Sequence, residues 1–481
     1  MSADLILSGG TIVSDTTRFK ADIAIKDGLI VAVGASETMP DAGETVDVSG
    51  LFLLPGAIDV HVHFREPGYT HKEDWETGSA AAAMGGVTTV FEMPNTHPPT
   101  RSIIELRDKQ KAAEKSYVDF GIYGLLAEDN IDELQGLIDG GVNAFKCFMG
   151  NTFGNLPSPS TGAMLEGFEI IAPSGLRISL HAETASIMAW RQERLMAAGC
   201  NDPLHHIGAR PDVVAVEAVA RAAILAEWTG ARCHVLHISS AAELVPLAQA
   251  KQRGVDITGE TCPCYLFLNS SDYERLGSVI RVNPPVREQK DSEAIWEALH
   301  SGVVDIIATD HAPHQPEEKK KDVIWDADCG FPGVETQMRL MLSEVNKGRM
   351  SLEHYVKISA VNPARIFGLH PAKGHLSVGA HADIAVVDMD RKETIRASDL
   401  HSRGKVTPFE GTDIQGAAIH TLVRGEFVQR DRTLVASMKG HGRQVTDIQR
   451  MPRPELKNED QYLSALVRGS RRLPQPVRVE A

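Results

Sequence analysis

The feature that most restricts the fold of this chain is a long alternation of apolar runs with helix-like segments, from Leu53 to Thr309. Short apolar runs predict buried strands, and the segments between them have the length and apolar spacing of helices. The expected strands are 86–93, 120–126, 144–149, 177–181, 233–238, 256–260 and 305–309, with helices at 103–114, 131–140, 213–229, 241–253 and 351–367. Such repetition predicts a parallel sheet, and at this length we expect an α/β fold with a closed (β/α)₈ TIM-type barrel.

The two ends of the chain have a different sequence pattern, which is typical of short strands joined by glycine turns. Strands are expected at 5–7, 11–13, 22–25 and 29–33, and again at 383–387 and 421–428. Asp27-Gly28 is a strong hairpin signal, and Arg424-Gly425 is placed in a similar way. We expect residues 1–54 plus 375–439 to form a small β-sandwich domain beside a barrel domain of residues 55–374. Residues 440–481, rich in Arg, Pro and Glu, are expected to form an extended C-terminal tail.

Composition excludes several classes of function. The net charge of -15 argues against a nucleic-acid partner, because phosphate neutralisation needs a basic surface. No apolar run approaches the ~20 residues that cross a bilayer, so no membrane partner is expected. The six cysteines are too sparse to staple a chain of 481 residues, and the Cys262/Cys264 spacing does not match a zinc knuckle. We expect a soluble cytoplasmic protein that acts on a small molecule.

A candidate site begins at His61-Val62-His63, directly after the apolar run 51–58. Side chains at i and i+2 of a strand point to the same face, so both imidazoles can hold one metal ion. Arg65 continues this parity and places a positive charge beside the metal, where it can hold an anionic group. An isolated pair of this kind can equally be two structural histidines, and Arg65 can instead pair with Glu66 or Asp74.

Further residues with metal-binding chemistry follow later apolar runs. Lys146 lies inside the apolar run 144–149, where a buried ammonium is costly. A neutral lysine can react with CO₂ to form a carbamate, whose two oxygens can bridge two cations. The alternative is a lysine that extends its ammonium to water at a strand end.

His181 follows the apolar run 176–180, His237 follows Val235-Leu236, and Asp310 ends the strand 305–309. An aspartate at that place can ligate a metal and accept a proton, although it can also cap a helix. In a barrel the carboxyl ends of all the strands meet at one face. The set of four histidines, one lysine and one aspartate at successive strand ends therefore favours a single site over unrelated structural roles.

These motifs resemble the amidohydrolase superfamily with a binuclear metal site, and within it the cyclic-amide group of dihydroorotase, allantoinase, hydantoinase and dihydropyrimidinase. The resemblance spans about residues 3–435. It implies two Zn²⁺ ions per chain, bridged by N6-carboxylated Lys146, and a homo-oligomer, dimer or tetramer. The implied metal ligands are His61, His63, Lys146, His181, His237 and Asp310. Asp310 is also the implied catalytic residue that shuttles the proton.

The string HVHFREPG at 61–68 resembles dihydroorotase most. The resemblance implies that Arg65 and Asn95 hold a ring carboxylate and that Asn283 and His314 contact the ring and its carboxylate. The turn 330–335 also resembles dihydroorotase, whereas allantoinases more often lack this arginine. We therefore expect a dihydroorotase that interconverts N-carbamoyl-L-aspartate and (S)-dihydroorotate in pyrimidine biosynthesis. The alternatives are an allantoinase or hydantoinase/dihydropyrimidinase with the same centre, or a non-catalytic dihydroorotase-like subunit.

The chain departs from the family pattern at Cys264, where many relatives have histidine. Because that residue is not an implied metal ligand, the change is expected to affect only the surroundings of the metals or the pocket. The segment 150–162 is expected to border the pocket.

Overall fold

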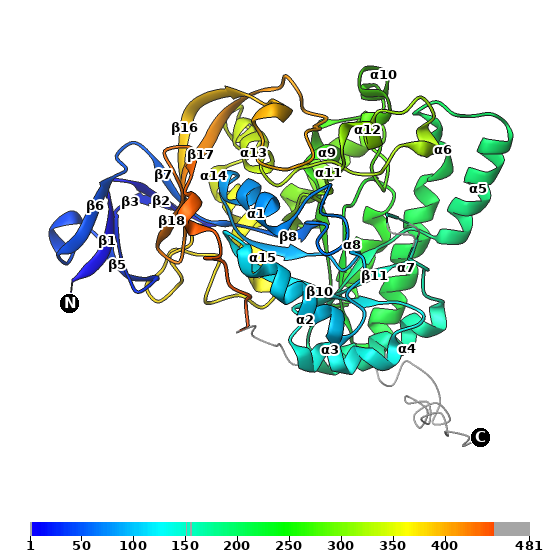
Figure 1. Cartoon of the computed structure of the whole chain (residues 1–481), viewed down its shortest axis with the longest axis horizontal. Helices are drawn as coiled ribbons and strands as arrows, with labels where there is room; N and C mark the ends of the chain where they lie inside the picture. Colours follow the sequence, from blue (N-terminus) through cyan, green and yellow to red (C-terminus); the bar gives the residue numbers. More distant parts are fainter. Residues whose placement is uncertain (1, 151, 154–155, 447–481) are drawn as a thin grey trace.

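Eight parallel strands form the barrel at the centre of the molecule (Figure 1). The computed structural model describes residues 2–150, 152–153 and 156–446. The barrel strands are β8 (Ala57–Val62), β9 (Val87–Glu92), β10 (Asp119–Leu126), β11 (Ala144–Phe148), β12 (Arg177–His181), β13 (Arg232–Val235), β14 (Ile257–Thr261) and β15 (Ile306–Ile307). Each pairs with the next in parallel, and a parallel bridge between Val62 and His311 joins the two ends. The predicted (β/α)₈ barrel is confirmed.

Helices cover the outside of the barrel and connect its strands. Those that follow each strand and pack on the barrel are α1 (Trp75–Met84), α2 (Ile103–Ala112), α3 (Leu134–Gly140), α4 (Thr161–Ile171), α7 (Asp212–Thr229), α8 (Leu244–Gln252), α11 (Gln289–Ser301) and α13 (Gln337–Asn346). Additional helices are α5 (Ala185–Ala197), α6 (His205–Ala209), α9 (Pro263–Phe267), α10 (Asp272–Leu276) and α12 (Pro316–Lys319) in the connections, and α14 (Leu352–Val356) and α15 (Asn362–Ile366) after α13. In the described part of the chain no helix is long and apolar enough to cross a membrane.

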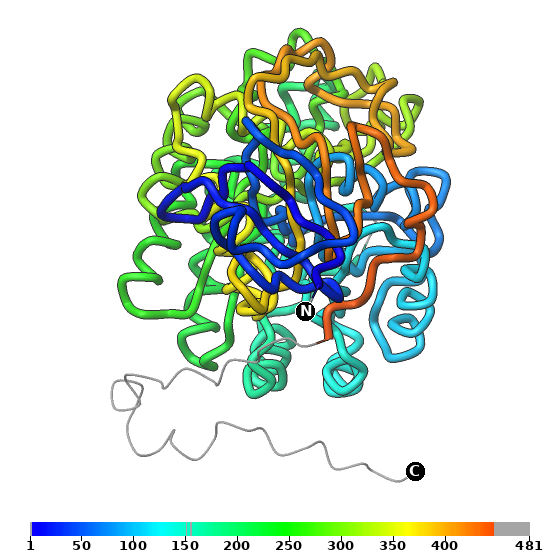
Figure 2. Tube along the Cα trace, turned by 90° about the vertical axis from the view of Figure 1, so that its left-hand side faces the viewer, coloured from blue at the N-terminus to red at the C-terminus, as the bar shows by residue number. Residues whose placement is uncertain are grey.

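Two sheets built from both ends of the chain pack beside the barrel (Figures 1 and 2). One sheet has the order β5 (Leu29–Gly34), β4 (Asp22–Lys26), β1 (Ala3–Ser8) and β6 (Ala42–Asp47). The other has the order β19 (Thr433–Leu434), β18 (Glu426–Arg430), β17 (Asp413–Val423), β16 (Ile384–Thr394), β7 (Phe52–Pro55), β2 (Thr11–Val13) and β3 (Arg18–Lys20). Their shared core joins Leu7 and Ile23 to Ile384 and Leu422, all fully buried.

Both predicted hairpins form, because their turn residues adopt the left-handed backbone that a two-residue turn requires. Asp27 and Gly28 have φ of 51° and 79°, and Arg424 and Gly425 have φ of 45° and 78°. The exact domain boundaries stay a prediction, as do the cytoplasmic location and the homo-oligomer. Of the predicted tail, residues 440–446 run along the start of β10, where Val445 N donates to Phe120 O at 2.8 Å. The remainder, 447–481, lies outside the described residues.

One long excursion links the sandwich to the barrel. Residues 395–412, between β16 and β17, reach the barrel face on which the carboxyl ends of the strands open. Arg403 N donates to Glu73 Oε1 at 3.1 Å, and His401 N donates to Glu335 Oε2 at 2.7 Å. Both glutamates are almost fully buried. The sandwich therefore contacts the same face of the barrel that carries the predicted site.

Candidate metal centre and substrate pocket

The six predicted metal ligands come together at the carboxyl ends of the barrel strands. His61 lies on β8 and His63 directly after it, Lys146 lies on β11, His181 ends β12, and His237 and Asp310 follow β13 and β15. The ring centroids of His61 and His63 are 5.3 Å apart, and those of His61 and His237 are 5.4 Å apart. Parallel strands in a barrel place their carboxyl ends at one face, which explains why residues up to 249 positions apart meet here.

Three ligand atoms form a compact first cluster. His61 Nε2 lies 3.2 Å from Asp310 Oδ1, and His63 Nε2 lies 3.1 Å from the same oxygen. The three side chains offer atoms within 4.8 Å of one another, a spacing suited to one metal ion. His61 Nε2 is buried and has no hydrogen-bond partner among the described residues. A buried acceptor without a partner is costly, so this atom fits a bound cation.

The far nitrogens of both histidines are held by other side chains. His61 Nδ1 contacts Glu260 Oε1 at 2.6 Å, and His63 Nδ1 contacts Asn95 Oδ1 at 2.7 Å. Each acceptor fixes the proton on Nδ1 and leaves Nε2 free to bind a metal. The oxygen of Asn95 thus contacts a predicted metal ligand, whereas the sequence predicted that Asn95 contacts the substrate.

His181 and His237 form a second pair. His181 Nδ1 lies 2.9 Å from His237 Nε2, and His181 Nε2 donates to Glu183 Oε2 at 2.9 Å. Because Glu183 accepts a hydrogen bond from the Nε2–H of His181, Nδ1 carries the free lone pair, which faces His237 and suits a metal. Burial by itself raises the pKa of Glu183, but the Arg210 charge and the His181 hydrogen bond bring it down to about 2. The carboxylate therefore stays ionised beside the histidine.

Lys146 lies near enough to both groups to affect the pKa of His61, His237 and Asp310, and it is 1% exposed. Its Nζ is 4.6 Å from the centre of the Phe148 ring, and no carboxylate of the described residues lies within salt-bridge distance. Burial lowers the pKa of Lys146 to about 8, although Asp310 and Glu260 oppose this shift. A low pKa favours the neutral amine, which is the form that reacts with CO₂.

The backbone is strained at three residues of this region. Arg65, His237 and Asp310 have positive φ values of 64°, 39° and 47°, in the left-handed region that disfavours residues other than glycine. Asp59 helps to hold this arrangement, since it accepts from His61 N at 3.1 Å and from Thr309 N at 3.2 Å. The strand ends are thus fixed with their side chains turned towards the centre of the site.

Beside the metal ligands lies a small pocket that contains Arg65. It is lined by His63, Arg65, Asn95, Thr152, Phe153, Val282, Asn283, Asp310, Ala312 and Cys329, and its volume is about 20 Å³. That volume holds about one water molecule. Arg65 is 1% exposed and lies 4.4 Å from the centre of the Phe153 ring. Its Nε and Nη1 atoms have no hydrogen-bond partner among the described residues.

Of two further predicted substrate contacts, Asn283 lines this pocket, whereas His314 is fully buried behind it against Arg65 and Phe153. His314 Nε2 is 3.2 Å from Arg65 Nη2, and His314 Nδ1 is 2.9 Å from Lys72 Nζ. Burial lowers the pKa of His314 to about 3, so the imidazole is neutral. The Asn283 amide is satisfied when its NH₂ faces His206 Nε2 at 3.0 Å and its oxygen accepts from Arg210 Nη2 at 3.2 Å.

Sequence reasoning missed the residues that hold the ligands. Glu260 lies on β14 and Glu183 two residues after His181, and both are fully buried. An acidic residue inside an apolar strand, or at the same parity as a ligand histidine, is the signal that could have revealed them. Phe153, in the segment predicted to border the pocket, stacks on Arg65. Cys264 is 3% exposed, and burial holds its thiol pKa well above the usual range.

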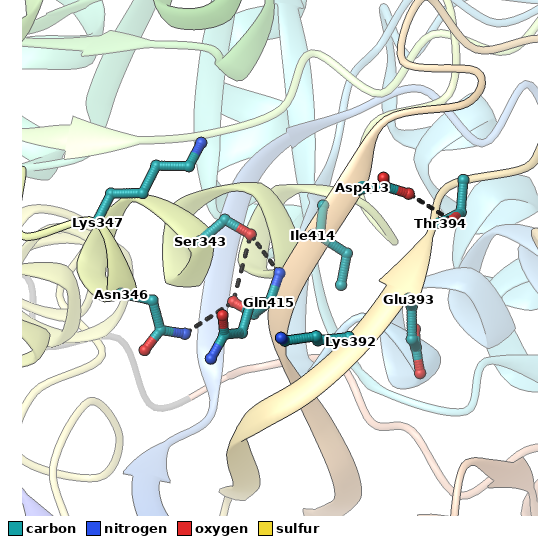
Figure 3. Close-up of a pocket in the computed structure, with 9 residues that line it drawn as sticks. All are labelled: Ser343, Asn346, Lys347, Lys392, Glu393, Thr394, Asp413, Ile414 and Gln415. Carbon is teal, nitrogen blue, oxygen red and sulfur yellow. Dashed lines mark hydrogen bonds between the residues drawn. The ribbon is translucent and has the colours of Figure 1, made fainter.

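A second hollow lies away from this site, between α13 and strands β16 and β17 (Figure 3). It measures about 500 Å³, but its walls are mostly paired with one another. Gln415 N donates to Ser343 Oγ at 2.7 Å, and Asn346 Nδ2 donates to Gln415 O at 3.0 Å. None of the predicted site residues lines this hollow, so the barrel face carries the candidate site.

Comparisons with known proteins agree with this geometry. A model of the amidohydrolase family matches residues 52–428. The chain belongs to the amidohydrolase family. Among curated members, an L-hydantoinase of Paenarthrobacter aurescens is 36% identical over 450 residues, covering 92% of this chain and 98% of that protein. An allantoinase of Deinococcus radiodurans is 36% identical over 444 residues, with the same coverage of 92% and 98%.

Solved structures of the family share the whole fold. An L-hydantoinase (dihydropyrimidinase) from Arthrobacter aurescens superposes with a TM-score of 0.90 at 35% identity, covering 92% of this chain and 100% of that one. A dihydropyrimidinase from Brevibacillus agri gives a TM-score of 0.87 at 30% identity, with 93% and 99% covered. The predicted superfamily is therefore confirmed. These relatives support the alternative of a hydantoinase or allantoinase better than the dihydroorotase expected first.

Proposed function

We propose that the protein hydrolyses a cyclic ureide, a hydantoin-type ring that carries an anionic group, at a binuclear zinc centre. The observation that carries this proposal is the joint position of three features. His63 and Asp310 of the first ligand cluster line one pocket together with Arg65, whose Nε and Nη1 have no hydrogen-bond partner among the described residues. His61 packs against both His63 and His237, so the second histidine pair lies next to this cluster. Family membership and the hydantoinase and allantoinase relatives support hydrolysis of a cyclic amide.

The residues present suit two zinc ions. His61, His63 and Asp310 would hold one ion, His181 and His237 the other, and N6-carboxylated Lys146 would bridge them. Nitrogen and carboxylate ligands with their far atoms fixed by Glu260, Asn95 and Glu183 are typical of such sites. When bound, the ions supply a nucleophilic hydroxide near neutral pH and polarise the amide carbonyl.

Asp310 is the group placed to move the proton. Its carboxylate lies at the pocket wall, and burial raises its pKa to about 6 despite the nearby Lys146 and His181. It takes a proton from the attacking water and gives it to the ring nitrogen as the amide C–N bond breaks. In the direction of ring closure the same proton transfers run backwards.

Two observations bear on the identity of the ring. The relatives support a five-membered hydantoin or allantoin ring. Arg65, buried with two unpartnered nitrogen atoms, supports a negatively charged substituent. A hydantoin with an acidic side chain satisfies both observations. Dihydroorotate is the second candidate, because its ring carboxylate also suits Arg65 and because the 61–68 string resembles dihydroorotase.

A matched pair of substrates separates these candidates. Hydantoin-5-acetate and dihydroorotate are isomers, and both open to N-carbamoyl-aspartate, so the product assay is the same for both. We expect zinc-loaded protein to favour hydantoin-5-acetate over dihydroorotate and over neutral rings, namely 5-methylhydantoin, allantoin and dihydrouracil. Both enantiomers should be supplied separately. A preference for dihydroorotate would establish the second candidate. A preference for a neutral ring would contradict the role of Arg65, and zinc-loaded protein inactive on all of them would overturn the proposal.

A further inference from the structure

We infer that Arg210 is a positioning residue that couples the second histidine pair to the wall of the substrate pocket. Its guanidinium contacts Glu183, which holds His181, and also Asn283, which lines the pocket. One side chain thus supports both a predicted metal ligand and the surface that receives the ring. This inference rests on the proposed metal-dependent function and adds a link between metal retention and substrate affinity.

The first contact of Arg210 is with the carboxylate that orients His181. Arg210 Nη1 forms an ion pair with Glu183 Oε2, the same oxygen that accepts from His181 Nε2 at 2.9 Å. Glu183 is 0% exposed, and its other oxygen has no hydrogen-bond partner among the described residues. A buried carboxylate needs a partner charge, so Arg210 keeps Glu183 in place against the histidine.

The second contact is with the pocket wall. The Asn283 amide is assigned with its NH₂ towards His206, because in that orientation the NH₂ can donate to His206 Nε2 at 3.0 Å and to Val282 O at 3.3 Å. In the same orientation its oxygen accepts from Arg210 Nη2 at 3.2 Å. The side chain of Asn283 is thereby anchored from behind the pocket. Its position, and with it the position of the adjoining wall, depends on the guanidinium.

The backbone of Arg210 is fixed as well. Arg287 Nη1 donates to Arg210 O at 2.9 Å, and Arg287 is itself paired with Asp212 at 2.8 Å. Arg210 is 7% exposed. The fork geometry matters here, because the planar guanidinium presents two nitrogens to two different acceptors, whereas a lysine ammonium supplies one point charge. A lysine at this position can keep the pair with Glu183 but cannot hold Asn283 in addition.

Four variants separate the two contacts: Glu183→Gln, Asn283→Ala, Arg210→Met and Arg210→Lys. The first measurement is zinc per chain and the rate at which zinc passes to a coloured chelator, with no substrate present. We expect Glu183→Gln and Arg210→Met to release zinc about tenfold faster than the wild type. Arg210→Lys and Asn283→Ala should release zinc at the wild-type rate.

The second measurement is the KM of the preferred ring, or the Kd of N-carbamoyl-aspartate by calorimetry. We expect Asn283→Ala, Arg210→Met and Arg210→Lys each to weaken binding about fivefold, the usual effect of one lost hydrogen bond. The matched control is Arg253→Met, because Arg253 pairs with Glu227 on the surface at 3.1 Å and is 44% exposed. This control should leave both measurements unchanged.

The pattern across the variants decides the inference. The inference is overturned if Arg210→Met leaves either the rate of zinc release or the ligand affinity at the wild-type value. It is also overturned if Arg210→Lys binds the ligand as tightly as the wild type does. If circular dichroism shows that Arg210→Met does not fold, Arg210→Lys and Asn283→Ala still test the inference. Both variants must then lose the same amount of ligand affinity while they retain zinc. A wild type that binds zinc and hydrolyses no ring counts against the proposed function alone, because zinc release needs no substrate.

Discussion

Replacing Arg65 with methionine should make the substrate-free protein more stable and less active. Arg65 is 1% exposed, and two of its nitrogens have no partner among the described residues. Burial lowers its pKa to about 10 although Glu92 and Asp310 oppose the shift. Compared with the usual pKa of arginine, that fall corresponds to about 3 kcal/mol of disfavoured charge. Methionine keeps the apolar stem against Phe153 and removes this cost, so we expect a gain of about 1 to 3 kcal/mol.

The same change should remove the recognition of an anionic ring. Two charge-assisted hydrogen bonds contribute about 1.5 kcal/mol or more each, so their loss lowers kcat/KM for hydantoin-5-acetate by about 100-fold or more. A neutral ring such as 5-methylhydantoin makes no ion pair with Arg65. Its kcat/KM should therefore change little.

The assay combines urea unfolding of the substrate-free protein with steady-state kinetics on the two rings. Arg65→Gln is a useful companion, because it removes the charge but keeps hydrogen-bond donors. The reasoning is refuted if Arg65→Met lowers the free energy of unfolding, or if both rings lose activity to the same extent. Either result would mean that Arg65 is a structural cation with a compensated charge.

Three further predictions concern the metal bridge, the proton carrier and a buried lysine. Lys146→Ala should lower zinc from two ions per chain to one or none, measured by mass spectrometry, with the circular dichroism spectrum unchanged. Asp310→Asn should lower kcat by about 10² to 10⁴-fold, and wild-type turnover by this variant would exclude the proton role. Lys319 is fully buried, and burial lowers its pKa to about 7, while Nζ donates to Arg281 O at 2.7 Å. Between pH 7 and about 10 the unfolded chain keeps the Lys319 proton that the folded chain has lost. The free energy of unfolding should therefore rise with pH over this range, by at most about 1.4 kcal/mol per pH unit. Urea unfolding of Lys319→Met between pH 6.5 and 9.5 should lack this slope, and an unchanged slope would count against it.

The barrel could be predicted because its strands are buried on both faces and read as continuous apolar runs. The strand 177–181 was predicted to the residue, and the hairpin at Asp27-Gly28 was specified by the left-handed backbone of its turn. Residues 185–209 could not be assigned, since 12 of the 13 residues of α5 are not buried and its apolar period is weak. The excursion 395–412 has no period at all and is placed by contacts with a distant part of the chain.

The site, like the fold, could be predicted in part. Histidine, lysine and aspartate at strand ends can be recognised in the sequence, because burying polar side chains beside apolar runs is costly. The side chains that hold these ligands cannot be recognised in this way, since the contact between His61 and Glu260 spans 199 positions and depends on the closed barrel. Asn95 shows the limit: its position at the pocket was foreseen, but its oxygen faces His63. A sequence motif indicates which residues meet and leaves open which atom faces which.

The excursion 395–412 has a consequence for any attempt to shorten this chain. Its backbone donates to Glu73, and Glu73 Oε2 lies 3.4 Å from Nε2 of His311, the residue directly after Asp310. The sandwich thus contacts the loop that carries Asp310, the proposed proton shuttle. A barrel without the terminal sheets would retain every proposed ligand, but the loop of Asp310 would lose this contact. We therefore expect the minimal active unit to be larger than the barrel.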